Sequence, residues 1–477
     1  MIPNKRVLLL YPPVSKFERY SSEIGNAGGE QIPLGIYYIA SFLSQYDYQV
    51  SVVDGEATHL NIHEILKKIK IFNPSYIGIS STTAVFHRAL ESAKAIKKEF
   101  PEKKIILGGP HISSNVLHAM SFQEFDYGVI GEGEVAIKEL LDALIEKKQI
   151  DDIKGLTFRN KNTEIIITPK REGIANLDIL PFPAYDLIND ISIYTPPPSN
   201  YKTLPVINMI TSRGCPSQCT FCDRSVFGDK YRQRSAQNIV NEIKYLKQKY
   251  GIREIAFVDD TFMLIKKRIF EIFELLDHEN IHFYWTCMSR INIMDYEFLK
   301  YIKSKGCWHI SFGIESGDEN ILKIIRKNIS FEKTEQVIKW CHELGIKTKG
   351  FFIIGHPGET LETINKTIKF ACKLKLDDIV VTINTPIPGS EQHNEAAKYG
   401  TLDYTDWSQW NYWRPVFVPH GLSKEIVLKK HREIYRKFYL RPRILFRYAM
   451  SFIGKGGWKR FKMVFGASLF MFKKSSL

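Results

Sequence analysis

The stretch VINMITSRGCPSQCTFCDR occupies residues 206–224 and holds three of the seven cysteines in the chain. Its first part, residues 206–211, is an apolar run that predicts a strand. The loop after this strand places Cys215, Cys219 and Cys222 in a C-x3-C-x2-C pattern. Three thiolates on one loop can bind three irons of a [4Fe–4S] cluster, because soft sulfur ligands stabilise iron–sulfur clusters. The fourth iron would then be open to a substrate or a cofactor.

Other uses of these cysteines fit less well. A structural zinc site usually has four protein ligands, and residues 206–240 contain no histidine that would complete one. The odd number of cysteines and the absence of a secretory context argue against a disulfide framework. The remaining four are separate from one another and are expected to be small buried hydrophobic residues: Cys287, Cys307, Cys341 and Cys372.

Strand-like runs alternate with helical patterns beyond the cysteine loop. The helix that follows the loop has apolar residues along one face and Ser235 in position to cap it. Six strand–helix units predict a partial (β/α)6 barrel, whose chemistry lies at the carboxyl ends of its strands. The strands are expected near residues 206–211, 254–258, 282–286, 308–313, 349–354 and 378–383.

A similar alternation precedes the loop. It predicts a Rossmann-like, five-stranded parallel sheet of the α/β class, whose ligand would bind at the carboxyl ends of the strands. Small polar loops follow these ends, which suits a large polar ligand. The expected strands are Val7–Leu10, Val50–Val53, Tyr76–Ser80, Lys104–Leu107 and Tyr127–Ile130, with helices near 34–45, 61–70, 84–98, 113–120 and 134–147.

Composition and length describe an ordinary folded protein. The chain has 477 residues, of which 44% are hydrophobic and 25% charged, so general disorder is excluded. The first residues show no signal-peptide layout. No uncharged apolar run reaches the roughly 18–20 residues that a transmembrane helix needs. We therefore expect a cytoplasmic protein.

Positive charge is concentrated at the carboxyl end. The formal net charge is +14, and residues 424–477 contain 15 Lys and Arg against two acids, Glu425 and Glu433. The rest of the chain is close to neutral, which argues against a nucleic-acid-binding protein. Aromatic and aliphatic residues lie between these cations. This pattern suits either an interfacial helix at the inner face of an anionic membrane or a helical cap with a solvated basic face.

Composition shifts suggest four regions. Residues 1–147 form the first α/β domain, and a proline-containing linker covers residues 148–203. The barrel spans residues 204–400. Residues 401–477 are expected to form a basic, helical carboxyl-terminal segment.

The cysteine loop resembles the signature of the radical S-adenosylmethionine (SAM) superfamily, C-x3-C-x-aromatic-C. The resemblance implies that the open iron chelates SAM and that one electron cleaves the cofactor to a 5′-deoxyadenosyl radical. Similar motifs end the later strands: Phe312 to Gly317 lies where relatives use acidic and hydroxyl groups on the ribose, and Gly350 to Thr360 matches the glycine motif of the family. The implied SAM-site residues are Phe221, Arg290, Gly313, Glu315, Ser316, Gly355 and Pro357. Asp259 and Asp260 follow the second strand, and their role stays open.

An α/β sheet placed before such a barrel resembles the cobalamin-binding radical SAM group, which includes carbon methylases and the anaerobic magnesium-protoporphyrin monomethyl ester cyclase. The resemblance covers about residues 5–400. It implies cobalamin contacts from Ser81, Thr82, Gly108, Gly109, His111, Gly131 and Gly133. The loop after the first strand, Tyr11-Pro12-Pro13, lacks the cobalt-ligating histidine of many cobalamin proteins. The lower face of the cofactor is therefore expected to lack a protein histidine, with the nucleotide base displaced into the sheet.

This resemblance implies methylation of an unactivated carbon in a hydrophobic or lipid substrate, with ferredoxin or flavodoxin as electron donor. One alternative keeps both cofactors for cyclisation, oxidation or rearrangement of a tetrapyrrole, lipid or natural product. Another is a radical enzyme whose first domain has lost cobalamin. A transfer-RNA methylthiotransferase is disfavoured, because residues 1–214 contain none of the extra cluster cysteines that those enzymes carry.

Overall fold

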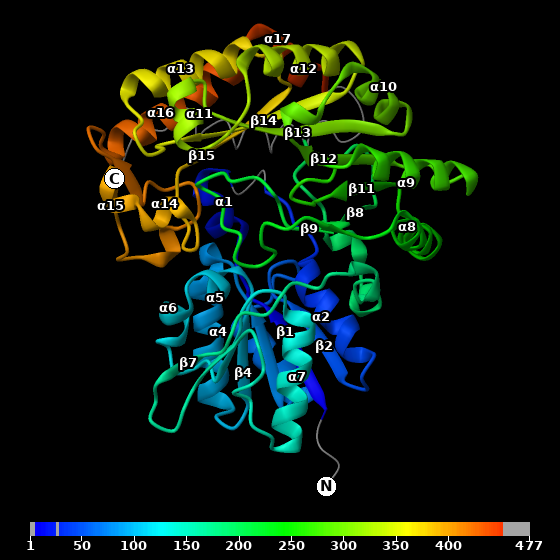
Figure 1. Ribbon diagram of the computed structural model, residues 1–477, viewed down its shortest axis with the longest axis vertical. Helices are drawn as coiled ribbons and strands as arrows, with labels where there is room; N and C mark the ends of the chain where they lie inside the picture. The colour runs from blue at the N-terminus through cyan, green and yellow to red at the C-terminus, as the bar shows by residue number, and fades with distance from the viewer. Residues whose placement is uncertain (1–4, 25–27, 452–477) are drawn as a thin grey trace.

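The computed structural model describes residues 5–24 and 28–451. Its main features are two sheets, one mainly and one entirely parallel, one in each half of the molecule, with helices packed outside them (Figure 1). Within the described residues, no helix is both long and apolar enough to cross a membrane.

The first sheet has the strand order β2-β1-β3-β4-β5-β6-β7, and its first five strands are parallel, as predicted. Alternation along β1 explains its two buried faces: Leu8 and Leu10 join the core under α3 and α4, while Val7 and Leu9 face α2 and α7. The elements are β1 (Arg6–Tyr11), α1 (Lys16–Ile24), α2 (Leu34–Ser44), β2 (Gln49–Asp54), α3 (Ile62–Phe72), β3 (Tyr76–Ser80), α4 (Phe86–Glu99), β4 (Lys104–Gly108), α5 (Pro110–Ser114), α6 (Val116–Met120), β5 (Tyr127–Val129) and α7 (Gly133–Glu146).

This sheet is wider than the five predicted strands. Antiparallel strands β6 (Leu156–Arg159) and β7 (Ile165–Ile167) extend it beyond β5, and they come from the segment expected to be only a linker. The rest of that segment contains three short 3-10 helices, η3 (Leu177–Ile179), η4 (Tyr185–Leu187) and η5 (Ile191–Ile193). The predicted helix at 113–120 is two short helices, because the backbone leaves the helical region at Asn115. Helix α1 was not predicted.

The second sheet contains the six predicted barrel strands in the order β15-β14-β13-β12-β11-β8, all parallel. Ser235 caps α8 by accepting a hydrogen bond from the Asn238 N–H, as its position predicted. The elements are β8 (Val206–Met209), α8 (Ala236–Tyr250), β11 (Glu254–Phe257), α9 (Lys266–His278), β12 (Tyr284–Ser289), α10 (Tyr296–Ser304), β13 (Cys307–Glu315), α11 (Glu319–Ile324), α12 (Phe331–Glu343), β14 (Lys347–Ile354), α13 (Leu361–Lys373) and β15 (Asp378–Ile383).

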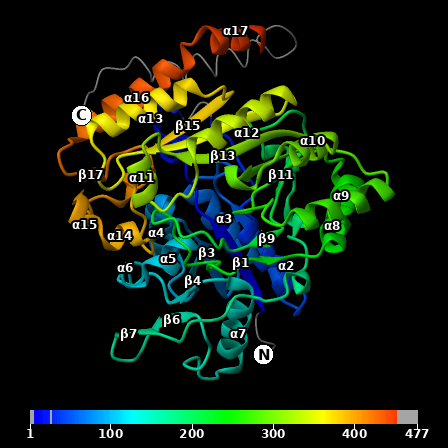
Figure 2. The ribbon, with the colours of Figure 1, turned by 45° about the horizontal axis from the view of Figure 1, so that its top comes forward.

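The carboxyl-terminal part is less helical than expected. It contains α14 (Glu391–Asn394), α15 (Ala396–Tyr399), a small sheet of β16 (Gly400–Leu402) and β17 (Phe417–Pro419), and the 3-10 helix η7 (Trp407–Gln409). Only then do α16 (Lys424–Tyr439) and α17 (Pro442–Ser451) begin, and they run along the outside of the barrel half (Figure 2). Tyr435 on α16 donates to and accepts from the backbone of Val381, so this helix covers the edge strand β15. The predicted basic tail beyond residue 451 lies outside the described residues.

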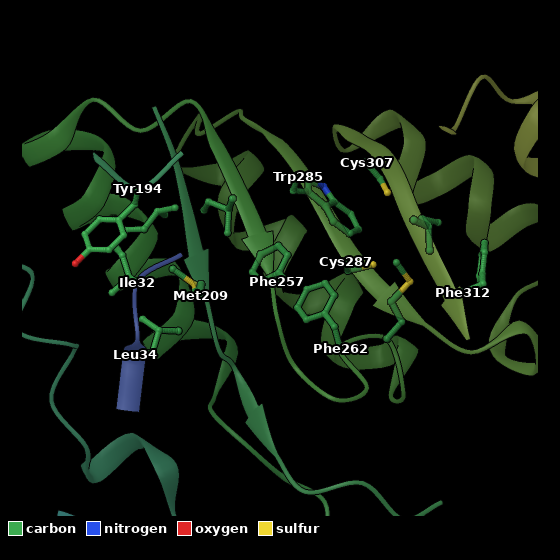
Figure 3. Close-up of a cluster of buried hydrophobic side chains, with 14 of the residues drawn as sticks. Ile32, Leu34, Tyr194, Met209, Phe257, Phe262, Trp285, Cys287, Cys307 and Phe312 are labelled. Atoms are coloured by element: carbon green, nitrogen blue, oxygen red, sulfur yellow. The ribbon is translucent and has the colours of Figure 1, made fainter. Parts of the chain in front are cut away.

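One hydrophobic core connects the two halves. Ile32 and Leu34, which precede and begin α2, belong to the same cluster as Met209 on β8 (Figure 3). Cys287 and Cys307 are buried among Phe257, Trp285 and other barrel side chains, which confirms their expected role as small hydrophobic residues. The shared core holds the two sheets together around the site described next.

Candidate active site

A single cavity of about 710 Å³ lies between the carboxyl ends of the two sheets. Its walls include Tyr11 and Ser80 from the first sheet and Ser289 and Glu315 from the second. The strand ends that the sequence marked in both halves therefore border one common space. Eleven of the predicted site residues line it: Cys215, Cys219, Cys222, Phe221, Arg290, Gly313, Glu315, Gly108, Gly109, Gly131 and Gly133.

The cysteine loop is closed at its base by two short antiparallel strands, β9 (Ser212–Arg213) and β10 (Arg232–Gln233). Gly214 follows with φ +85°, and a Cβ there would come within 2.3 Å of the Lys230 carbonyl oxygen. Only glycine fits this turn, because a side chain would collide with the returning backbone. The chain is thus forced to turn just before Cys215.

Contacts from the barrel hold the middle of the loop. The Thr220 N–H donates to the Ile325 carbonyl, and the Cys219 sulfur lies 3.9 Å from the Arg326 carbonyl oxygen. Cys219 is buried, Cys215 is half-buried and Cys222 is exposed, so the loop presents its thiols at different depths. No three His, Cys, Asp or Glu side chains within residues 5–24 and 28–451 are arranged to hold a single metal ion. A cluster makes a different demand, because each of its cysteines binds a separate iron.

Arg290 reaches the loop from the end of β12. Its guanidinium donates to the Ser217 hydroxyl and lies 4.0 Å from the Cys219 sulfur. Among the described residues it has no carboxylate partner, so it presents an uncompensated cation beside the loop. Such a cation can bind the carboxylate of a ligand, which suits the SAM-site role that the family resemblance implied for Arg290.

Glu315 occupies a left-handed backbone conformation, φ +67°, at the end of β13. Its carboxylate accepts a 2.9 Å hydrogen bond from the ammonium group of Lys327, and both side chains are buried. Lys327 was not predicted from the sequence, since nothing local distinguishes this lysine from the exposed ones around it. Its position becomes informative only once the chain brings it back to the strand end.

Three other predicted SAM-site residues do not line the cavity. Ser316 is fully buried, where its hydroxyl pairs with Thr367 and accepts from the Asp318 N–H. Gly355 and Pro357 belong to a turn in which Glu359 accepts from the Gly355 and His356 N–H groups. The His356 ring lies 5.9 Å from the ring of Phe221, so this turn supports Phe221 from behind.

The two acids after β11 are separated by the structure. Asp259 is buried and accepts from Thr211 and Ser212, which anchors the start of the cysteine loop. Asp260 lines the cavity and is exposed, whereas Asp259 is buried. Asp260 is therefore the member of the pair that can contact a ligand.

On the first sheet, glycines leave space at the strand ends. A Cβ on Gly108 would meet nothing within 4 Å, and one on Gly131 would approach only the Val226 carbonyl oxygen, at 3.8 Å. The cavity also extends along the sheet face, between Leu9, Gly78, Ile106 and Ile137.

Three predicted cobalamin contacts do not line the cavity: Ser81, Thr82 and His111. His111 is buried instead, with its ring nitrogens paired to Thr83 and His118, and burial lowers its pKa to about 3.

These features fit the cofactors implied by the sequence. The loop offers three thiols and leaves one iron of a cluster without a protein ligand. Four glycines at the ends of β4 and β5 line the cavity, and we call them the glycine edge: Gly108, Gly109, Gly131 and Gly133. Together with the apolar part of the cavity along the sheet face, this edge suits a large planar ligand with an extended tail. Tyr11 borders the cavity at the end of β1, and no histidine is among the cavity-lining residues.

Comparison with known proteins agrees with this assignment. A model described as "Radical SAM superfamily" matches residues 209–371, and one described as "B12 binding domain" matches residues 23–141. The chain is 36% identical over 447 residues to an uncharacterized methyltransferase of Pyrococcus horikoshii, covering 93% of this chain and 94% of the relative. It is 28% identical to cytidylyl-2-hydroxyethylphosphonate methyltransferase of Streptomyces wedmorensis (84% and 83% covered). It is 25% identical to the anaerobic magnesium-protoporphyrin IX monomethyl ester cyclase of Rubrivivax gelatinosus (92% and 78% covered).

Two solved structures share the whole architecture at 17% sequence identity. One is the radical SAM methyltransferase TsrM from Kitasatospora setae, with a TM-score of 0.69 over 92% of this chain and 89% of the other. The second is the cobalamin-dependent radical SAM enzyme OxsB, with a TM-score of 0.75 over 98% and 72%. The chain belongs to the cobalamin-binding radical SAM family and is a cobalamin-dependent radical SAM enzyme, with a [4Fe–4S] cluster, SAM and cobalamin as its cofactors.

Proposed function

We propose that this enzyme transfers a methyl group to an unactivated carbon of a hydrophobic substrate. The observation that carries the proposal is the single cavity bordered by both the cysteine loop and the glycine edge of the first sheet. When bound, the cluster with SAM supplies a carbon-centred radical, and cobalamin supplies a methyl group. The chain itself brings the sites for these reagents to one shared cavity, where bound cofactors and substrate would displace water.

The residues divide this work between the two sheets. Cys215, Cys219 and Cys222 are proposed to bind the cluster, while Phe221, Arg290, Gly313 and Glu315 hold SAM. The glycine edge, formed by Gly108, Gly109, Gly131 and Gly133, is proposed to bind cobalamin. The cobalamin-binding domain would then be residues 1–147, and the radical SAM barrel residues 204–400. Ser316, Gly355 and Pro357 then act by supporting these side chains.

A hydrophobic substrate is supported by the barrel side of the cavity. Ile210, Met288 and Phe351 line it together with Val226 and Phe227 of the cysteine loop. Apolar walls favour an apolar ligand, because the water they displace is poorly hydrogen-bonded. The electron that starts each cycle is proposed to come from a ferredoxin or flavodoxin.

Product analysis tests methyl transfer. The reconstituted enzyme would receive SAM with a trideuterated methyl group, a reductant and a lipid extract of the source organism. We expect labelled product together with S-adenosylhomocysteine and 5′-deoxyadenosine. Cys219→Ala should abolish 5′-deoxyadenosine, whereas Cys372→Ala, on helix α13, should not. Formation of 5′-deoxyadenosine and product without any labelled methyl group would overturn the proposal.

The second candidate function is cyclisation or oxidation with the same cofactors. It is favoured by the similarity to the magnesium-protoporphyrin cyclase, which covers 92% of this chain. The same experiment separates the two functions, since cyclisation or oxidation requires no S-adenosylhomocysteine in step with product.

We also propose that the carboxyl-terminal helices contact an anionic membrane. Leu440, Leu445 and Phe446 are exposed around the junction of α16 and α17, and Phe446 is 68% exposed. Exposed Arg436, Lys437 and Arg443 lie near them in the chain, and residues 452–477 add six cations and no acid. Apolar side chains between cations are typical of interfacial binding to anionic lipid.

Liposome co-sedimentation tests this contact with the full-length protein. The double variant Leu445→Gln/Phe446→Gln should bind vesicles of phosphatidylglycerol more weakly than the wild type. Ile71→Gln is the control, because Ile71 is 75% exposed in the other half of the molecule. Equal binding by all three proteins would refute the membrane contact.

A further inference from the structure

The base of the cysteine loop carries two arginines that face each other. Strands β9 and β10 pair Arg213 with Arg232. Residues 214–231 therefore form a loop that starts and ends at this pair and contains all three loop cysteines. Cys215 follows Arg213 by two residues. Any shift of the base therefore moves the cysteines with it.

Both arginines bind the loop after β5 in the other half of the molecule. Glu132 accepts from Arg213 at 3.0 Å through one oxygen and pairs with Arg232 through the other. Glu134 pairs with the second terminal nitrogen of Arg213 at 2.5 Å. The side chains of Arg213, Glu132 and Glu134 are each no more than 6% exposed. Two cations and two anions thus balance in a site that water scarcely reaches.

Neighbouring contacts restrict this arrangement to one geometry. The Arg213 guanidinium lies 5.4 Å from the centre of the Tyr38 ring and 5.2 Å from that of Phe227. Arg232 also donates to the carbonyls of Phe227 and Ile174, at 2.9 and 2.8 Å. Rotating the cysteine loop relative to the first sheet would break several of these contacts together.

We propose that Arg213, Arg232, Glu132 and Glu134 form a positioning joint that fixes the cysteine loop relative to the cobalamin-binding sheet. Buried ion pairs often add little to stability compared with apolar side chains of the same size, but they can fix one relative position. Glu132 and Glu134 line the cavity on the cobalamin side, and Arg213 lines it beside Cys215. The joint therefore sets the distance between the two metal cofactors, and these four residues act through that distance.

The test measures that distance in the complete protein. Cob(II)alamin and the reduced cluster each carry unpaired electron spin, and their dipolar coupling falls steeply with separation. Two variants are compared with the wild type. Glu134→Gln keeps the shape of the side chain, and Arg213→Lys keeps the charge but loses the guanidinium that contacts Glu132 and Glu134 at the same time. Iron and cobalt per chain are measured first. We expect both metals to be retained and the single wild-type coupling to be replaced by a weaker, broader distribution.

Glu242→Gln is the matched control. Glu242 forms a buried ion pair with Arg234, also near the end of the cysteine loop, but it does not touch the loop after β5. It should therefore leave the coupling unchanged. The proposal is overturned if both joint variants keep the wild-type coupling, or if the control changes it equally. Because no substrate is required, this result is independent of whether the enzyme methylates.

Discussion

Glu315 and Lys327 illustrate how the site depends on single residues. They come from opposite sides of α11, and their side chains pair at 2.9 Å inside the cavity. Each charge is tolerated there because the other compensates its loss of hydration. A ligand that hydrogen-bonds to Glu315 must therefore fit beside Lys327.

Glu315→Gln should destabilise the protein, because it leaves the Lys327 ammonium group buried without a counter-charge. The expected loss in the free energy of unfolding is about 3–5 kcal/mol, measured by denaturant titration without cofactors. The double variant Glu315→Gln/Lys327→Met should recover part of this loss. A double variant less stable than Glu315→Gln would show that the pair is not the cause.

Glu359 makes stability depend on pH. Burial raises its pKa from 4.5 to about 8, although two backbone N–H groups oppose the rise. The native state thus keeps a proton that the unfolded chain releases at lower pH, so this contribution is complete below about pH 4.5 and is lost as pH rises towards 8. Glu359→Gln should flatten the decline in unfolding free energy over that range. The exposed Glu362→Gln is the control, and parallel curves for wild type and Glu359→Gln would contradict the assignment.

Cys219→Ala should remove the cluster without removing cobalamin, since its sulfur lies in the barrel half of the cavity. Iron should fall from about four atoms per chain towards background, while the amount of bound cobalamin stays the same. Cys372→Ala should retain iron. Equal loss of iron in both variants would mean that general instability, and not ligation, is responsible.

At the scale of elements, local patterns predicted most strands, and long-range contacts account for the exceptions. All eleven expected strands are present, because each is a short apolar, β-branched or aromatic run between helical patterns. Strands β6 and β7 were missed because they are only four and three residues long and lie in a segment whose prolines suggested a linker. The irregular run between β16 and β17 was expected to be helical, but η7 is held there by stacking of Trp407 on Trp410 and on His118 of α6.

The glycines after β4 test the role of the glycine edge. Gly109 has φ +94°, and a Cβ there would lie 2.8 Å from the Ser81 carbonyl oxygen, so Gly109→Ala should lower the melting temperature of the cofactor-free protein. Gly108→Ala meets no atom and should leave that temperature unchanged while weakening cobalamin binding. Calorimetry and absorbance titration measure the two effects. Wild-type cobalamin affinity in Gly108→Ala would show that the edge lies away from the cofactor.

At the scale of the whole molecule, the cofactor set was predictable from sequence, whereas the joint was not. Three cysteines within eight residues favour a cluster by their spacing, and the resemblance to the radical SAM family implies the other two cofactors. Arg213 and Glu134 are 79 residues apart, and either one alone resembles an ordinary surface charge. Their role appears only when two sheets, each predicted separately, are placed with the carboxyl ends of their strands around one cavity.

Methyl transfer between the two facing sheets, as proposed, can be tested without a substrate. The protein would be loaded with iron, sulfide and hydroxocobalamin, reduced, and incubated with SAM carrying a trideuterated methyl group. We expect the label to appear on the bound cobalamin, in an amount equal to the S-adenosylhomocysteine formed. Release of 5′-deoxyadenosine with no label on cobalamin and no S-adenosylhomocysteine would contradict it.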